Sequence, residues 1–318
     1  MPSDYLHNHK DFNNLLHIIE DETGIQSGLI EKDYWIMHAL YGLKKLDFQF
    51  ELKGGTSLSK GYHIIDRFSE DIDIHIKPPV EMGINENPKN NKPNNVEARR
   101  KFYDWLAETI KIDGIISVER DYAFDDIVSY RSGGVRLIYE SKTESISGIK
   151  DGILLEAGFD KVTPNFPLTI SSWAYEKAKE NKTIDIIDNR AVDIICYHPG
   201  FTFVEKLQTI ATKFRQEQTD GNPRANLMRQ YYDVYCLLEN EEVRKFVGTP
   251  EYESHKIERF PTVDLETPIA ENMAFLLSDA DLRRVFRKRY EATAALYYKG
   301  QPDFDVVLER INKYLNEL

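Results

Sequence analysis

The 318-residue chain has only two cysteines, Cys196 and Cys236, and they lie far apart in apolar segments. This number and separation exclude a disulfide framework and the paired ligand spacing of a zinc site. We therefore expect both to be buried thiols in a reducing compartment. No apolar run approaches the roughly 20 residues that a membrane span needs, and the chain does not open with a basic and then apolar signal segment. These absences predict a cytoplasmic protein that does not enter a membrane.

Positive charge is also scarce, because 41 Lys and Arg stand against 53 Asp and Glu and give a formal net charge of −12. Such a chain cannot coat nucleic acid indiscriminately, since that needs many contacts from Lys and Arg to phosphates. Any nucleic-acid site must be a local patch. The densest basic segment, residues 281–290, predicts either such a patch or a solvated helix face. Tyr290, Tyr297 and Tyr298 are available nearby for stacking on bases.

What the sequence does contain is an acidic strand in the segment 48–76. Alternating apolar and polar residues predict strands over 48–53 and from residue 71 onward. In the second strand the isoleucines enter the core, so Asp71 and Asp73 present their carboxylates side by side on the other face. Two carboxylates this close repel each other unless a cation lies between them. An all-oxygen pair suits Mg²⁺ or Mn²⁺, which complete their coordination with water and substrate phosphates.

A glycine turn lies between the two strands. Gly54 and Gly55 allow backbone N–H groups to approach an anion closely. Thr56 and Ser57 begin the following helix, whose N-terminus favours phosphate. Each element alone is common, but strand, glycine turn, helix and acidic strand in this order predict a site for a metal-bound phosphate group.

This order resembles the signature of the DNA polymerase β-like nucleotidyltransferases. Within that superfamily, the residues of this motif are similar to those of the AbiEii/AbiGii-type toxins of bacterial toxin–antitoxin and abortive-infection (phage-defence) systems. The spacer between Gly55 and Asp71 is longer than is usual in the superfamily, which predicts a longer helix or loop here. The residues that carry the resemblance are 52–60 (Leu-Lys-Gly-Gly-Thr-Ser-Leu-Ser-Lys), Arg67, Ser69, Glu70, Asp71 and Asp73.

The resemblance implies a toxin that transfers a nucleotide from an NTP to an RNA acceptor, such as a tRNA 3′ end, or to a protein, and that is controlled by an antitoxin encoded nearby. It also implies two Mg²⁺ bound by Asp71, Asp73 and a third carboxylate. Glu156 is the candidate, because a lone acid in an apolar strand is costly unless it is paired or metal-bound. Asp160 is the alternative. The nucleotide-binding residues implied are Gly54, Gly55, Thr56, Ser57, Arg67, Ser69, Lys206 and Arg229.

Two later helices carry a second resemblance to the same family. Lys206 lies on a helix predicted over 203–214, and Arg229 and Asp233 lie on the next. The resemblance implies that Lys206 neutralises the γ-phosphate or the leaving pyrophosphate and that Asp233 holds Lys206 in place. The alternative is a surface Lys–Asp pair, which contributes little to stability.

We expect an α+β protein, with a nucleotidyltransferase domain over 1–202 and a helical domain over 203–318 that closes the cleft. The first domain contains N-terminal helices and a small mixed sheet. Periodicity predicts the following elements: helices over 10–46 and 96–111, strands over 115–119, 135–140 and 152–158 (the last two pairing antiparallel), a polar loop over 85–95, a proline-containing crossing over 164–169, a short helix or irregular segment over 171–179 and a weak strand over 184–192.

Two questions stay open in the sequence. The charged run 31–33 (Glu-Lys-Asp) on the second helix is either an exposed helical turn or a brace in which Lys32 or Asp33 supports the site. The function has two alternatives: a metal-dependent glycosyltransferase, which also uses Asp-x-Asp to hold a nucleotide sugar, and a non-catalytic nucleotide-binding module. The glycosyltransferase accounts for Asp71 and Asp73 but not for the glycine turn or Lys206.

Overall fold

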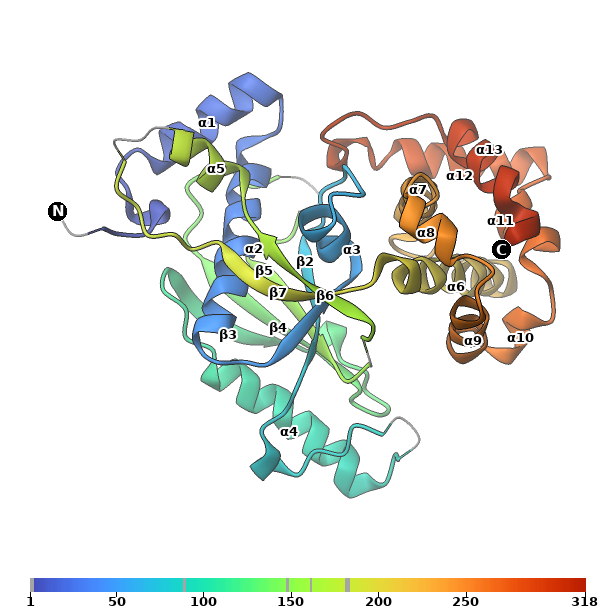
Figure 1. The fold of residues 1–318 in the computed structure, drawn as a ribbon, viewed down its shortest axis with the longest axis horizontal. Helices are drawn as coiled ribbons and strands as arrows, with labels where there is room; N and C mark the ends of the chain where they lie inside the picture. Colours follow the sequence, from blue (N-terminus) through green and yellow to red (C-terminus); the bar gives the residue numbers. More distant parts are fainter. Residues whose placement is uncertain (1–2, 88–89, 147–148, 161, 181–183) are drawn as a thin grey trace. The chain divides into compact units, whose positions relative to one another are not determined.

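The computed structural model describes the chain except for residues 1–2, 88–89, 147–148, 161 and 181–183. It forms two compact units (Figure 1). The first contains residues 1–61 and 69–197, and the second contains residues 62–68 and 198–318. The predicted α+β class is confirmed. The domain boundary predicted between residues 202 and 203 falls inside helix α6 (Pro199–Asp220), because this helix already begins at Pro199.

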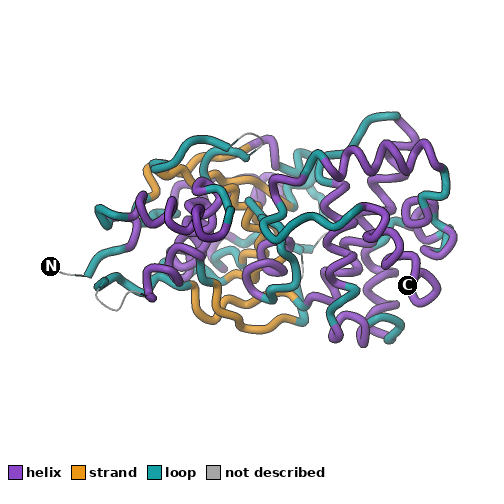
Figure 2. Tube along the Cα trace, turned by 90° about the horizontal axis from the view of Figure 1, so that it is seen from above, coloured by secondary structure: helices purple, strands orange, loops and turns teal. Residues whose placement is uncertain are grey.

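A mixed sheet forms the centre of the first unit, and its strands are drawn in orange in Figure 2. In the described part of the chain the sheet has seven strands in the order β3-β4-β5-β2-β1-β7-β6. Strand β2 pairs antiparallel with β1 and parallel with β5, and the predicted antiparallel pairing of β4 with β5 is confirmed. The strands are β1 (Phe50–Lys53), β2 (Asp71–Ile76), β3 (Ile115–Asp121), β4 (Ser132–Tyr139), β5 (Ile153–Gly158), β6 (Asn165–Ile170) and β7 (Ala191–Tyr197).

Helices cover this sheet, and most of them match the periodicity of the sequence. The N-terminal pair is interrupted at Gly24, whose φ of 73° is the left-handed conformation that ends a helix. The helices of the first unit are α1 (Phe12–Thr23), α2 (Ser27–Lys45), α3 (Gly54–Thr56, continued by a π-helical turn Ser57–Gly61), α4 (Pro93–Thr109) and α5 (Trp173–Glu180), with short 3-10 turns at Leu6–Asn8, Val80–Met82 and Tyr122–Phe124. Part of the predicted loop 85–95 lies outside the described residues.

Helix α4 identifies the two faces of the sheet. The ring of Tyr103 on α4 lies directly against Gly133 of β4. Gly133 is opposite Ala157 of β5, which in turn is beside Ile74 of β2. Because paired residues on neighbouring strands share a face, α4 covers the face of Ile74. The carboxylates of β2 point to the opposite face.

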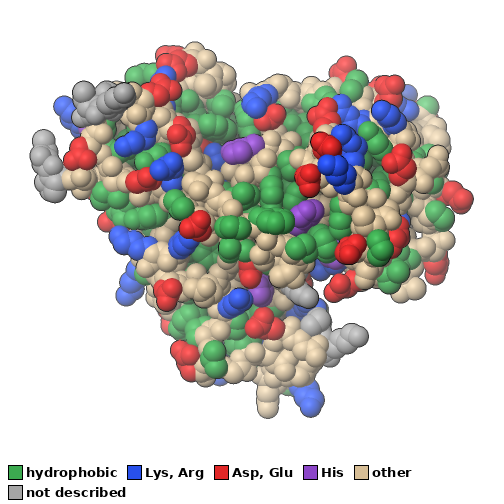
Figure 3. All heavy atoms as spheres, viewed as in Figure 1, with side chains coloured by type: hydrophobic (Ala, Val, Ile, Leu, Met, Phe, Trp, Pro, Cys, Tyr) green, Lys and Arg blue, Asp and Glu red, His purple; other side chains and the backbone are tan. Residues whose placement is uncertain are grey.

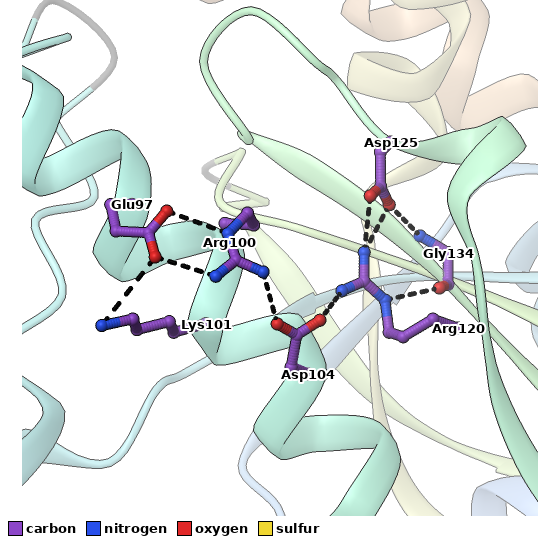
Figure 4. Close-up of polar contacts among 7 residues, drawn as sticks. All are labelled: Glu97, Arg100, Lys101, Asp104, Arg120, Asp125 and Gly134. Carbon is purple, nitrogen blue, oxygen red and sulfur yellow. Dashed lines mark hydrogen bonds and ion pairs between the residues drawn. The ribbon is translucent and has the colours of Figure 1, made fainter.

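Ion pairs fasten α4 to strand β3 (Figure 4). Asp104 of α4 lies between Arg100, at 2.7 Å, and Arg120 of β3, at 2.5 Å. Arg120 also donates to both oxygens of Asp125 at 2.6 Å and to the carbonyl of Gly134. The Arg120 and Asp125 side chains are only 6% and 1% exposed. This buried pair fixes β3 against β4, whereas the exposed pair of Arg100 adds little.

The sequence prediction was wrong for the last two strands. Residues 165–170 are not a crossing but strand β6, which pairs antiparallel with β7. Strand β7 begins at Ala191, where the predicted weak strand was about to end, and Ile186 makes only an isolated bridge to Asp4. Pro167 is tolerated in β6 because this strand is at the edge of the sheet, where one side of the backbone needs no partner.

The second unit is helical, as the sequence predicts. Helices α6 and α7 pack together. The segment 62–68 belongs to this unit, and the N–H of Phe68 donates to the carbonyl of Leu296 at 2.7 Å. None of the helices in the described residues is long and apolar enough to cross a membrane. Its helices are α6, α7 (Leu227–Leu237), α8 (Glu241–Phe246), α9 (Pro250–Arg259), α10 (Thr262–Leu265), α11 (Met273–Leu276), α12 (Ala280–Glu291) and α13 (Phe304–Tyr314), with 3-10 turns at Ile269–Glu271, Ala294–Leu296 and Leu315–Glu317.

Candidate active site

Three carboxylates lie on one face of the sheet, opposite the face that α4 covers. Asp71 and Asp73 are half-buried on β2, while the intervening Ile72 is fully buried, as the alternation predicts. Glu156 on the parallel neighbour β5 lies directly beside Asp73 in the register. The sequence alternative, Asp160, lies beyond the end of β5 and forms ion pairs with Lys53 and Arg131 instead. The register therefore favours Glu156 as the third carboxylate.

The three acids repel one another in a partly dehydrated setting. Burial, followed by the charges of Glu70 and Asp73, raises the pKa of Asp71 to about 6. Burial, followed by the charges of Asp73 and Asp71, raises the pKa of Glu156 to about 7. Without a cation, part of this group is protonated near neutral pH. A bound divalent cation would relieve the repulsion and displace those protons.

The glycine turn is shaped around one of these acids. Gly54 has a φ of +72°, and a Cβ atom built on it would lie 2.1 Å from Oδ2 of Asp73. A side chain at this position would therefore displace the carboxylate of Asp73. The hydroxyl of Thr56 donates to the carbonyl of Asp71 at 2.5 Å, and that of Ser57 donates to the carbonyl of Gly54 at 3.0 Å. Both side chains are buried, so these hydroxyls fix the turn and the strand.

The donor set fits a hard divalent cation. All three side chains offer carboxylate oxygen, and the absence of a side chain at Gly54 leaves room for the carboxylate of Asp73. Among the described residues, no group of three or more His, Cys, Asp or Glu is arranged so that it could hold a metal ion. The fit therefore depends on the chemistry and register of Asp71, Asp73 and Glu156.

The second unit contains Arg67, Lys206, Arg229 and Asp233 of the predicted site residues. Asp233 of α7 is fully buried and binds Arg67 through both oxygens, at 2.6 and 2.7 Å. The ammonium of Lys206 lies 3.0 Å from the same carboxylate. Burial alone would raise the pKa of Asp233, but Arg67 and Lys206 together lower it below its usual value. The predicted pairing of Lys206 with Asp233 is observed, although the acid is buried rather than on the surface.

The structure reassigns one predicted nucleotide ligand. Arg67 is 4% exposed, and its guanidinium binds Asp233 and the carbonyl of Phe68. It is thus a structural partner of Asp233. Arg229 is half-buried, one helical turn before that acid, and Ser69 is half-buried two residues before Asp71.

Sequence reasoning left the run 31–33 undecided, and the structure buries all of it. Glu31 accepts hydrogen bonds from the loop 141–143, through two hydroxyls and one backbone N–H. Asp33 forms an ion pair with Lys60 at 2.7 Å and accepts from the N–H of Trp173 at 2.9 Å. The exposed-turn interpretation was wrong. The available signal was the apolar residues on every side of this charged run, since a helix apolar all round is a buried helix.

The basic helix α12 is largely neutralised within its own unit. Arg283 and Arg287 both bind Asp305, and Arg289 binds Glu217. Tyr290 and Tyr297 are buried, so their proposed stacking on bases was wrong. On the molecular face in Figure 3, acidic and basic side chains are interspersed. These observations favour a solvated, salt-bridged helix face.

A comparison with known families shows to which family the chain belongs. The family described as "Nucleotidyl transferase AbiEii toxin, Type IV TA system" matches residues 38–310. The chain belongs to the AbiEii toxin family. No curated protein matches it significantly. Among solved structures, an antigenic nucleotidyltransferase-like protein from Paracoccidioides brasiliensis is similar at 11% identity and a TM-score of 0.31, over 74% of this chain and 98% of the other. A TM-score this low supports no argument about function.

The contact between Gly54 and Asp73 gives this AbiEii-family protein a matched pair of variants. Gly54 and Gly24 have nearly equal φ values, +72° and +73°, but a Cβ on Gly24 would meet no atom within 4 Å. Gly54→Ala and Gly24→Ala should each lose about 1 kcal/mol of stability through backbone strain, measured by urea unfolding. Only Gly54→Ala should also displace Asp73 and lower the rate of pyrophosphate release, by about a hundredfold. Equal rates of pyrophosphate release in the two variants would contradict the role of Gly54 in making room for Asp73.

The raised pKa values predict a pH effect on the metal-free protein. The folded state holds these protons more tightly than the unfolded chain, so their stabilising effect is lost as the pH rises from about 4 to about 7. Glu156→Gln removes one of the repelling charges. With a chelator present, its free energy of unfolding should exceed that of the wild type by about 3 kcal/mol at pH 8 and by under about 1 kcal/mol at pH 5. If the free energy of unfolding of Glu156→Gln exceeded that of the wild type by the same amount at both pH values, repulsion among the three carboxylates would be contradicted.

Proposed function

We propose that this AbiEii-family toxin transfers a nucleotide from an NTP to an RNA or protein acceptor in a Mg²⁺-dependent reaction, with a tRNA 3′ end as one candidate acceptor. The observation that carries the proposal is the register of β2 and β5, which brings Asp71, Asp73 and Glu156 together beside the glycine turn. The family implies an antitoxin as the partner of the toxin. Its substrates and its two reduced thiols are consistent with action in the cytoplasm.

The carboxylates would hold the cation, with Mn²⁺ as the alternative to Mg²⁺. When bound, it would neutralise charge on the phosphates and lower the pKa of the acceptor hydroxyl. The acceptor oxygen forms a new bond to the α-phosphorus, and the bond from that phosphorus to the bridging oxygen breaks. Pyrophosphate leaves, and the hydroxyl proton passes to water. Asp71 and Asp73 fix the position of this reaction on β2, while backbone N–H groups at Gly54 and Gly55 face the phosphates.

The glycosyltransferase and the non-catalytic module have less support. Neither explains why the turn next to Asp73 must be free of a side chain. The family match also names a nucleotidyl transferase.

The proposal is tested with NTPs labelled at the α-phosphorus. Purified protein, Mg²⁺ and each NTP in turn are incubated with and without total tRNA, and pyrophosphate release and acceptor labelling are measured. Asp71→Ala, Asp73→Ala and Glu156→Gln should each abolish both signals with the fold retained, because none of these side chains belongs to the core. Asp160→Asn is the matched control, since Asp160 is tied to Lys53 and Arg131, and it should stay active. Full activity in Asp71→Ala or Asp73→Ala, or inactivity of Asp160→Asn alone, would overturn the assignment.

Lys206 is proposed to bind the departing pyrophosphate. Lys206→Ala should lower kcat by two to three orders of magnitude, about 3–4 kcal/mol of transition-state stabilisation, with a much smaller rise in the KM for NTP. Lys206→Arg should rescue only part of the loss, because a planar fork does not replace a point charge. Lys213→Ala, two turns further along α6, is the control and should leave kcat unchanged. A lysine that serves only Asp233 would instead change the stability and spare turnover.

A further inference from the structure

Lys32 lies in the middle of a run of three buried charges. Glu31, Lys32 and Asp33 of α2 are 0%, 2% and 1% exposed. Consecutive helical residues point about 100° apart, so these three side chains reach three different segments of the first unit. Charges are rarely buried this completely unless they are paired. Glu31 and Asp33 meet the loop 141–143 and the turn of Lys60, as described above, and Lys32 is directed toward the carboxylates.

Within the described part of the chain, the ammonium of Lys32 has two partners, and each leads into one carboxylate-bearing strand. It donates to the carbonyl of Lys150 at 2.5 Å, three residues before β5 begins. It also lies 3.7 Å from Oε2 of Glu70, the residue directly before Asp71 and β2. The same Glu70 oxygen accepts the backbone N–H of Lys150 at 3.4 Å. These three residues form a closed set of contacts across the entrances to β2 and β5.

We propose that Lys32 is a positioning residue that holds the starts of β2 and β5 together and so keeps Asp71, Asp73 and Glu156 in register for a divalent cation. This inference rests on the proposed function of the three carboxylates. It adds a residue that touches neither the cation nor the substrate, and its effect passes through the two strands.

The physical need for such a clamp lies in the position of Asp71. The paired register of β2 and β5 begins at Asp71 opposite Leu154, so the ladder gives no support on the near side of this acid. Asp71, Asp73 and Glu156 are like charges on one face of these two strands, so their repulsion pushes the strands apart at the same place. A cross-link directly before the first pair opposes this separation.

Removal of Lys32 changes the affinity for a divalent cation in opposite directions through charge and through positioning, which makes the proposal testable. Lys32 and Glu70 form a neutral pair, so removing Lys32 alone leaves one more negative charge beside the carboxylates. Through charge alone, the site of Lys32→Met would attract a divalent cation more strongly. Loss of positioning would weaken binding instead. Replacing both partners, as Lys32→Met with Glu70→Gln, removes the clamp without changing the net charge.

The experiment measures Mn²⁺ binding by the purified full chain without NTP, together with its unfolding by urea. Lys32→Met should be less stable than the wild type, because Glu70 loses its cation, and should bind Mn²⁺ more weakly. The double variant should recover much of the stability, yet its Mn²⁺ affinity should stay about 10–100-fold below that of the wild type, as is typical when an outer partner of a metal site is lost. The Mn²⁺ affinity of Lys32→Arg, which keeps the charge, should lie between that of the wild type and that of Lys32→Met.

A matched control separates positioning from general stability. Arg120→Met with Asp125→Asn removes another buried ion pair of the first unit, on β3 and the adjoining turn. It should change the urea midpoint without changing the Mn²⁺ affinity of the folded protein. Wild-type affinity in the Lys32/Glu70 double variant, or tighter binding by Lys32→Met, would overturn the role of Lys32. Failure of the wild type to bind Mn²⁺, or unchanged binding by Asp73→Ala, would overturn the proposed metal site itself, and the two failures are thus distinguishable.

Discussion

The constraint on which the first unit depends is the close approach of three like charges on two adjacent strands. Asp73 and Glu156 are neighbours in the register, and Asp71 is two residues away on the same face. The chain counters their repulsion from within, because Lys150 lowers the pKa of both Asp71 and Glu156, and Lys32 and Lys53 each act on one of them. On the opposite face, buried isoleucines and helix α4 hold the strands against this repulsion. The repulsion that remains is the reason why we propose a bound cation at this sheet.

The glycine turn and the acidic strand contact each other so closely that they form one structural unit rather than two separate motifs. Gly54 yields the space that the carboxylate of Asp73 occupies, and Lys53 is paired with Asp73 in the antiparallel register. The hydroxyl of Thr56 binds the backbone of Asp71. A change in either the turn or the strand therefore moves the other. For the same reason, the hydroxyls that the sequence suggested as phosphate ligands are already engaged in joining the two parts.

The parts of the fold that local pattern determines were predictable: helices α2 and α4, the alternation in β2, and the antiparallel pair β4 and β5. The carboxylate of Glu156 was also found, because an acid in an apolar strand is costly without a partner. Strand β6 was missed because Pro167 made its sequence resemble a loop, and no local pattern indicates which strand will be at an edge. The predicted weak strand overlapped β7 only at its first residues, Ala191 and Val192. The partnership of Arg67 with Asp233 joins residues far apart in the sequence, and nothing local distinguishes such an arginine from a phosphate ligand. The detour of residues 62–68 into the helical unit explains the long spacer between Gly55 and Asp71.

In the cluster around Asp233, the positive charge of Lys206 is not neutralised by the buried acid. Arg67 already binds both oxygens of Asp233, so the charge of this acid is matched before Lys206 is counted. The three residues together carry one net positive charge. Of their side chains, Asp233 is 0% exposed, Arg67 5% and Lys206 13%, so the surplus charge is nearest to solvent at Lys206. A surface Lys–Asp pair would be neutral and mobile, whereas here the acid orients the lysine and the arginine supplies the countercharge. This division of roles is what a lysine needs in order to meet an anion that develops only as a reaction proceeds.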